Sequence, residues 1–142
     1  MNHATARASS NTPDSWLSYQ HQEIEACKEA IRTQPEKAEN YYNLGAAYDR
    51  LGHVEEAIAA YTEAIRLKPD FAEAHFHLGA LYGQLGRSGE EIEAYTEAVR
   101  IKPDFAEAHF NLGLSYLIVG DTHSAQAQCK ILEALRLEEM EY

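Results

Sequence analysis

The side chains most suited to chemistry in this sequence are seven histidines, several paired acids and two cysteines. His75 and His77 stand two residues apart, so on a helix they point to different faces and do not share a metal ion. The sequence contains no HExxH or CxxC spacing and no acid-rich loop of the kind that holds zinc or calcium. We therefore expect no metal and no cofactor.

Patterns for covalent or phosphoryl chemistry are also missing from the sequence. It has no glycine-rich phosphate loop, no nucleophile elbow and no cysteine–histidine pairing. The paired acids Glu55-Glu56 and Glu90-Glu91 fall at the expected starts of helices, where the helix dipole favours negative charge. We expect a protein that is not an enzyme.

The charge balance limits the kinds of partner. Twelve basic and 23 acidic residues give a formal net charge of -11. Nucleic acids and anionic membranes both require clustered lysine and arginine, so neither is expected as a partner. The N-terminal stretch has no apolar core typical of a signal peptide, and no apolar run is long enough to span a membrane. We expect a cytoplasmic protein whose partner is another protein, neutral to basic in charge.

A repeat with a period of 34 residues must position these side chains. Residues 38–71 carry the landmarks Leu44-Gly45, Tyr48, Ala57, Tyr61 and Pro69. They recur one period later as Leu78-Gly79, Tyr82, Tyr95 and Pro103, and more loosely as Leu112-Gly113, Tyr116 and Ala125. A fixed period of this length is typical of stacked repeat architectures.

These landmarks resemble those of the tetratricopeptide repeat family. The family pattern of an aromatic residue, Leu-Gly, Tyr, Ala, a second aromatic and Pro fits Tyr41, Leu44-Gly45, Tyr48, Ala57, Tyr61 and Pro69. The resemblance implies an all-α fold, a right-handed solenoid of stacked antiparallel helix pairs that forms a superhelix. It also implies a scaffold role in protein–protein interaction.

The repeat register divides the chain into five segments. We expect a disordered leader at 1–11, an N-terminal cap helix (half a repeat) at 12–34, and repeats at 38–71, 72–105 and 106–139, the last with a divergent C-terminal helix. Helices are expected at 38–51, 54–68, 72–85, 88–102, 106–119 and 122–137, the last continuing toward Met140.

Glycine and aspartate mark the expected helix ends and contacts. Gly52, Gly86 and Gly120 fall where helices should stop. Asp70 with Glu73, and Asp104 with Glu107, have the spacing of capping boxes. Gly45, Gly79 and Gly113 lie inside helices, where glycine costs about 1 kcal/mol relative to alanine, so we expect each to admit a closely packed neighbour.

Two kinds of side chain depart from the pattern. Glu91 stands where the repeat has a small buried residue, and we expect it to reach toward solvent, the alternative being a shifted helix start near Ser88. Cys27 and Cys129 share one register too far apart for a disulfide, so we expect two free, mostly buried thiols.

The resemblance implies that the first helix of each repeat lines a concave groove that binds a peptide or helix of a partner. By register, the groove residues of the first repeat are Glu39, Tyr42, Asn43, Ala46, Asp49 and Arg50. Those of the second are Glu73, Phe76, His77, Ala80, Gly83 and Gln84, and those of the third are Glu107, Phe110, Asn111, Leu114, Leu117 and Ile118.

Asn43, His77 and Asn111 share one register within this set. An amide both donates and accepts hydrogen bonds, so a row of them suits a peptide backbone. The simpler interpretation is that polar residues only solvate an open face. The alternative function is self-assembly, in which an uncapped C-terminal helix packs on another copy of the chain. A third option is a regulatory domain that belongs to a larger enzyme or secretion apparatus.

Overall fold

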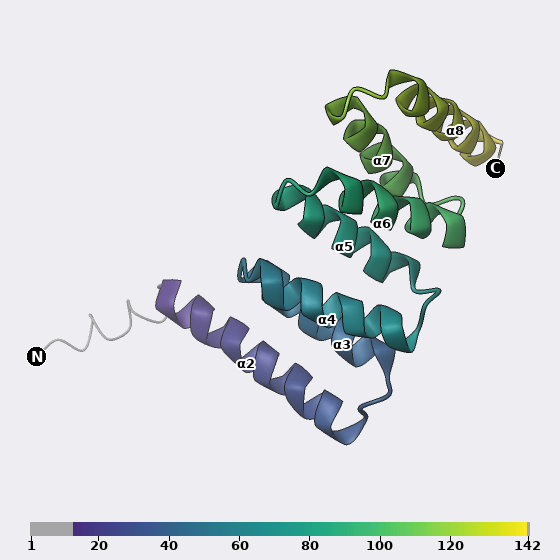
Figure 1. The fold of residues 1–142 in the computed structure, drawn as a ribbon. Helices are drawn as coiled ribbons and strands as arrows, with labels where there is room; N and C mark the ends of the chain where they lie inside the picture. The colour runs from purple at the N-terminus through teal and green to yellow at the C-terminus, as the bar shows by residue number, and fades with distance from the viewer. Residues whose placement is uncertain (1–12, 142) are drawn as a thin grey trace, which may run out of the picture. The chain divides into compact units, whose positions relative to one another are not determined.

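The computed structural model describes residues 13–141, and every regular element within that range is an α-helix (Figure 1). The elements are α2 (Pro13–Thr33), α3 (Ala38–Arg50), α4 (Val54–Leu67), α5 (Ala72–Gln84), α6 (Ser88–Ile101), α7 (Ala106–Ile118) and α8 (Thr122–Met140). The expected starts of α3 to α8 are confirmed, and α8 continues to Met140 as expected. The leader expected at 1–11 lies outside the described residues.

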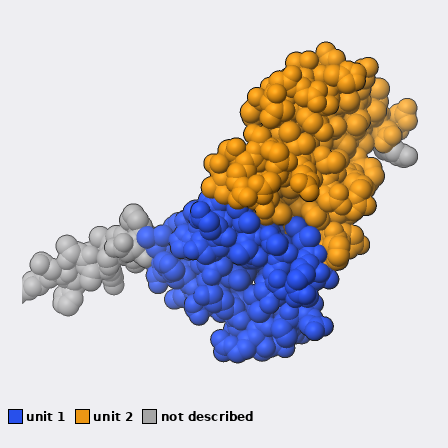
Figure 2. Space-filling view, viewed as in Figure 1, with its two compact units in different colours: residues 1–67 blue, residues 68–142 orange. Residues whose placement is uncertain are grey.

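The helices pack in adjacent pairs within two compact units that divide between Leu67 and Lys68 (Figure 2). In the first unit α3 packs on α4, and α2 packs on α3. In the second unit α5 packs on α6, α6 on α7, and α7 on α8. The all-helical class and the paired packing expected from the repeat are therefore correct.

Glycine ends the first helix of each repeat, as expected. Gly52, Gly86 and Gly120 have φ values of 76°, 72° and 85°, in the left-handed region where glycine has no steric penalty. Around Gly52, its N–H donates to the Asp49 carbonyl (2.9 Å) and the His53 N–H donates to the Tyr48 carbonyl (3.0 Å). This paired Schellman arrangement satisfies carbonyls that the helix end leaves open, and it recurs after α5 and α7.

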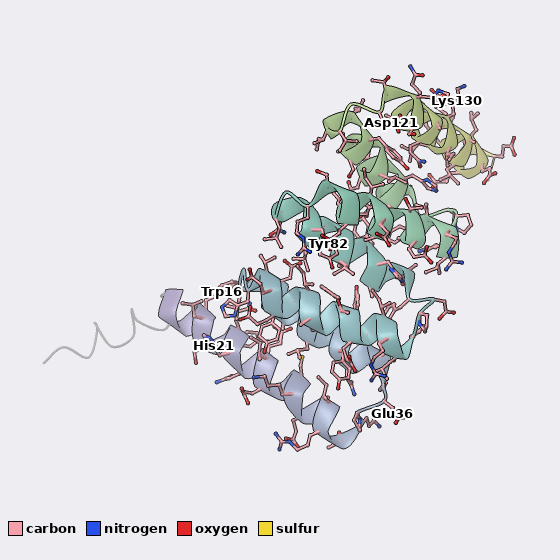
Figure 3. All side chains as sticks on the ribbon, in the orientation of Figure 1. Trp16, His21, Glu36, Tyr82, Asp121 and Lys130 are labelled. Carbon is pink, nitrogen blue, oxygen red and sulfur yellow. The ribbon has the colours of Figure 1, made fainter. Side chains whose placement is uncertain are left out.

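The expected capping boxes do not form. α5 and α7 begin one residue later than such boxes require, with Phe71 and Phe105 at the N-cap and no side-chain cap hydrogen bond. Phe71 is buried, so packing of the aromatic ring fixes the position that the aspartate was expected to hold. A side-chain cap does occur before α8, where Asp121 accepts hydrogen bonds from the Ser124 N–H (3.1 Å) and hydroxyl (2.7 Å). Figure 3 shows Asp121 at the turn between α7 and α8.

The helix-interior glycines admit a close neighbour in two repeats and not in the third. A Cβ on Gly45 would lie 2.9 Å from the Tyr61 ring, and one on Gly79 would lie 2.9 Å from the Tyr95 ring. At Gly113 the nearest atom would be Gln128 Cβ at 3.5 Å, an ordinary contact. The expectation is confirmed for the first two repeats and wrong for Gly113, because the register that holds tyrosine in α4 and α6 holds Cys129 in α8.

The two thiols differ in burial. Both cysteines are free, as expected. Cys27 is half-buried and packs on the cluster formed by Ile24, Leu44, Ala47 and Ala60 in the first unit. Cys129 is exposed, so its expected burial is wrong. Ala125, one helical turn earlier, is the one buried side chain among the described residues of α8. Only one side of α8 is covered, the side that packs on α7.

Candidate partner-binding faces

A tyrosine from the second helix reaches the face of the first helix in both well-matched repeats. Tyr61 of α4 packs over Gly45 and meets the Tyr42 ring edge-on, with ring centroids 5.6 Å apart. Tyr95 of α6 packs over Gly79 and meets the Phe76 ring at 5.7 Å. The missing side chain on each glycine therefore brings a phenol from the second helix among the expected binding residues of the first.

In the first unit, α3 carries the expected residues Glu39, Tyr42, Asn43, Asp49 and Arg50. Glu39, Asn43 and Arg50 are exposed, whereas Tyr42 and Asp49 are half-buried. Arg50 forms an ion pair with Glu23 of α2, so its charge is already matched within the chain. Asn43 lines a shallow pocket together with Glu23, Ala26, Cys27, Ala30 and Asn40, which places it beside α2.

The hydroxyl of Tyr61 has a raised pKa, mainly because the side chain is buried. Burial is the main cause that raises the pKa of Tyr61, and the nearby Asp49 carboxylate raises it further, against a smaller opposing effect of Arg50. Tyr61 therefore stays protonated at neutral pH and retains its O–H donor.

In the second unit, α5 carries Glu73, Phe76, His77 and Gln84. Glu73 lies 4.0 Å from the Lys102 ammonium, and Gln84 is exposed. Phe76 is half-buried, and its ring packs against Phe105 (4.9 Å), His77 (5.3 Å) and Tyr95 (5.7 Å). Phe76 is thus largely a packing residue, with only part of its ring accessible.

The most apolar exposed face of the second unit lies on α7. Phe110, Leu114, Leu117 and Ile118 are 56%, 44%, 54% and 74% exposed. Their spacing of i, i+4, i+7 and i+8 places them along one side of the helix; we call this set the α7 stripe. Glu107 is exposed one turn before it, and Asn111, beside Phe110, is half-buried. Exposed apolar surface of this kind is typical of an interaction site.

Tyr95 links the second and third repeats. The Asn111 side-chain amide donates a hydrogen bond to the Tyr95 hydroxyl over 3.4 Å. Burial is the main cause that raises the pKa of Tyr95; the Asn111 hydrogen bond lowers it, and the nearby Glu91 carboxylate raises it. α6 begins at Ser88, so the helix start is not shifted, and the half-buried Glu91 lies across Gly83.

The histidines serve the packing of the repeat. Nε2 of His75 lies 3.0 Å from the Pro69 carbonyl, and Nε2 of His109 lies 2.7 Å from the Pro103 carbonyl. Because a carbonyl only accepts, each Nε2 donates. His109 is also 2.7 Å from the Gln128 side-chain oxygen through Nδ1. Residues 13–141 hold no group of three His, Cys, Asp or Glu side chains arranged for a metal, and none of their helices is suited to cross a membrane.

The structure adds residues that the sequence argument did not select. Asn40 is buried and donates to the carbonyls of Ala30 (3.2 Å) and Gln34 (3.1 Å), which ties the end of α2 to α3. The next two repeats have Ala74 and Ala108 at this register. A single polar residue at a position that is otherwise alanine could have indicated a buried hydrogen bond. In the sequence Tyr95 was only a landmark of the repeat, and Glu91 only a departure from it.

Comparison with known proteins identifies relatives of this fold. A TPR repeat model matches residues 50–86 and 91–120, and tetratricopeptide repeat models match residues 26–59 and 72–105. A crystal structure of MamA shares 30% identity with a TM-score of 0.82, covering 89% of this chain and 74% of that chain. A second MamA structure shares 31% identity with a TM-score of 0.78, covering 87% and 67%.

A MamA fragment from Desulfovibrio magneticus RS-1 shares only the fold, at 19% identity and a TM-score of 0.75, covering 87% of this chain and 70% of that chain. A search of curated proteins found no match.

Proposed function

This chain belongs to the tetratricopeptide repeat family, and from that premise we propose that it is a non-enzymatic module that binds a segment of another protein on the faces of its first helices. Members of the family generally serve as protein–protein interaction modules and are typically non-catalytic. The proposed segment is an extended peptide or an amphipathic helix, neutral to basic in charge. The expected cytoplasmic location stays a prediction.

The α7 stripe is the observation that carries the proposal. Four large apolar side chains are exposed on one side of a single helix, in a chain with a net charge of -11. Burial of this area by a partner would be favourable at about 25 cal/mol per Å² of apolar surface. Asn111 borders the stripe and suits a peptide backbone, because an amide both donates and accepts. The wider row with Asn43 and His77 stays a prediction.

Peptide selection tests the proposal directly. Random 12-residue peptides are selected on the immobilised parent chain, and the best binder is measured by isothermal titration calorimetry. We expect Leu114→Glu to weaken binding at least ten-fold, about 1.4 kcal/mol, because it places a charge within the α7 stripe. Leu137→Glu changes an exposed leucine of α8, outside the α7 stripe; it is the control and should bind like the parent. The proposal fails if correctly folded parent selects no peptide, or if both variants bind equally well.

Self-assembly is the second candidate, supported by the outer side of α8. Leu137 and Met140 are 62% and 69% exposed and line a shallow hollow with Glu133 and Arg136. A second copy of the chain would cover this surface. Light scattering over a range of concentrations separates the two functions: a strict monomer excludes self-assembly, whereas oligomers that Leu137→Glu dissolves would support it.

A further inference from the structure

Two successive repeats each carry one acid at the same pair of registers, but on different helices. In the first repeat the acid is Asp49 of α3, and position 57 is a fully buried alanine. One period later Asp49 is replaced by Gly83, and Ala57 by Glu91. Burial is the main cause that raises the pKa of both tyrosines, with Asp49 as a smaller cause for Tyr61 and Glu91 as a smaller cause for Tyr95. The acid has moved from the first helix to the second.

The absence of a side chain at Gly83 makes this exchange possible. The Glu91 Oε2 occupies the space that a Gly83 Cβ would need, and the Glu91 Cδ would lie 3.0 Å from that Cβ. The Glu91 side chain therefore crosses from α6 over α5 at the register that Asp49 occupies in α3. It brings the carboxylate onto the α5 face, one helical turn before Tyr95, whose hydroxyl accepts a hydrogen bond from Asn111 of α7.

The cations within α6 and at its two caps are matched to other acids. Arg87 pairs with Glu90 and Arg100 pairs with Glu97, each within one turn. Lys102 lies beside Glu73. Within residues 13–141, no ion pair or hydrogen bond of the Glu91 carboxylate is found, although it is half-buried. A half-buried carboxylate without a counter-charge favours a cation supplied from outside.

We propose that Glu91 binds a lysine or arginine side chain of the partner segment, whose adjacent apolar side chains cover the α7 stripe. The proposal rests on the binding function proposed above and specifies its ligand: a peptide with one basic residue beside apolar ones. The chemistry fits, because Glu91 lies one helical turn from Tyr95, the Tyr95 hydroxyl meets the Asn111 amide, and Asn111 borders the apolar stripe. In the third repeat Leu117 stands at the register of Asp49, and Ala125 stands at the register of Glu91. The third repeat therefore has no acid equivalent to Glu91.

The test uses the best-binding peptide from the selection described above and a second peptide in which its basic residue is replaced by norleucine. Isothermal titration calorimetry measures the binding of both. We expect this replacement to weaken binding to the parent about five-fold, the upper range for a partly exposed ion pair. Binding to Glu91→Gln should be insensitive to it. Glu93→Gln, an exposed acid on the same helix, is the matched control and should discriminate like the parent. Circular dichroism establishes that each variant is folded.

A variant that moves the acid from α6 to α5 tests whether the carboxylate itself, and not another effect of changing Glu91, sets the preference. Gly83→Asp combined with Glu91→Ala restores the Asp–Ala pairing of the first repeat and should keep the preference for the basic peptide. Peptides that bind the α7 stripe with no basic residue, or a Glu91→Gln chain that still discriminates, would overturn this inference and leave the binding function intact. A folded parent that selects no peptide at all would overturn both.

Discussion

The carboxylate of Glu91 fills the space beside Gly83 where every other residue would place a Cβ. The two positions are complementary: the helix face with no side chain accepts the long acid, and the long acid replaces the small residue that the repeat has between its helices. The glutamate that replaces a small residue in α6 is thus accommodated by the glycine that replaces an aspartate in α5.

This pair should show measurable energetic coupling. Gly83→Ala gains helix propensity of about 1 kcal/mol when nothing obstructs the new methyl group. In the parent the methyl group must displace the Glu91 carboxylate, so we expect the gain to be smaller than in a Glu91→Ala background. Urea unfolding of the two single variants and the double variant gives the coupling energy. Equal effects of Gly83→Ala in both backgrounds would contradict the proximity of the two residues.

Alanine at the helix-interior glycines should have opposite effects in two repeats. Gly79→Ala places a methyl group 2.9 Å from the Tyr95 ring, which is 3% exposed and has no room to move. We expect a loss of about 1–3 kcal/mol of unfolding free energy. Gly113→Ala meets only an ordinary contact and should gain about 0.5–1 kcal/mol. Urea unfolding measures both, and two changes of the same sign would refute the close-approach argument.

His109 should contribute more to stability than its counterpart His75. His109 is buried and hydrogen-bonds with both Gln128 and Pro103, whereas His75 is half-buried and, within residues 13–141, hydrogen-bonds with Pro69 alone. His109→Phe keeps the ring but leaves polar groups unsatisfied, so we expect a loss of about 2–3 kcal/mol. The matched change His75→Phe should cost less than about 1 kcal/mol. Chemical denaturation measures the unfolding free energy of both variants. Similar losses for the two would contradict the prediction.

The Asp121 cap should make the stability of α8 depend on pH. The Ser124 hydroxyl and N–H hold the pKa of Asp121 below its ordinary value of 3.8. The cap therefore stabilises the folded state above the unfolded pKa, and this contribution is lost as the pH falls through the lower folded pKa.

We expect Asp121→Ala to unfold at lower urea concentration than the parent at pH 7, and this difference to shrink below pH 4. A difference that stays constant down to pH 2.5 would show that the carboxylate charge plays no part.

The sequence predicted the helices well and the contacts of particular side chains less well. Gly52, Gly86 and Gly120 ended their helices as expected, because a left-handed residue is a local requirement that one residue type meets best. The helix starts were also correct. The capping boxes failed because the burial of Phe71, a tertiary effect, decided which residue became the N-cap.

The candidate binding residues were predicted as positions on a helix, and not as partners in contacts. Arg50 was expected to be available and is paired with Glu23 of α2, a residue from a segment that matches only half a repeat. Exposure of Cys129 depended on which side of α8 is covered, which a repeated register does not encode. Contacts between repeats therefore needed the structure.

The two native cysteines allow the two compact units to be followed separately by thiol modification. The chain has one thiol in each compact unit, half-buried Cys27 in the first and exposed Cys129 in the second. Burial is the main cause that raises the pKa of the Cys27 thiol, which lowers its thiolate fraction and its reactivity. A limiting amount of a maleimide dye would thus mark the second unit first, and the slower modification of Cys27 would time the opening of α2 from the first unit.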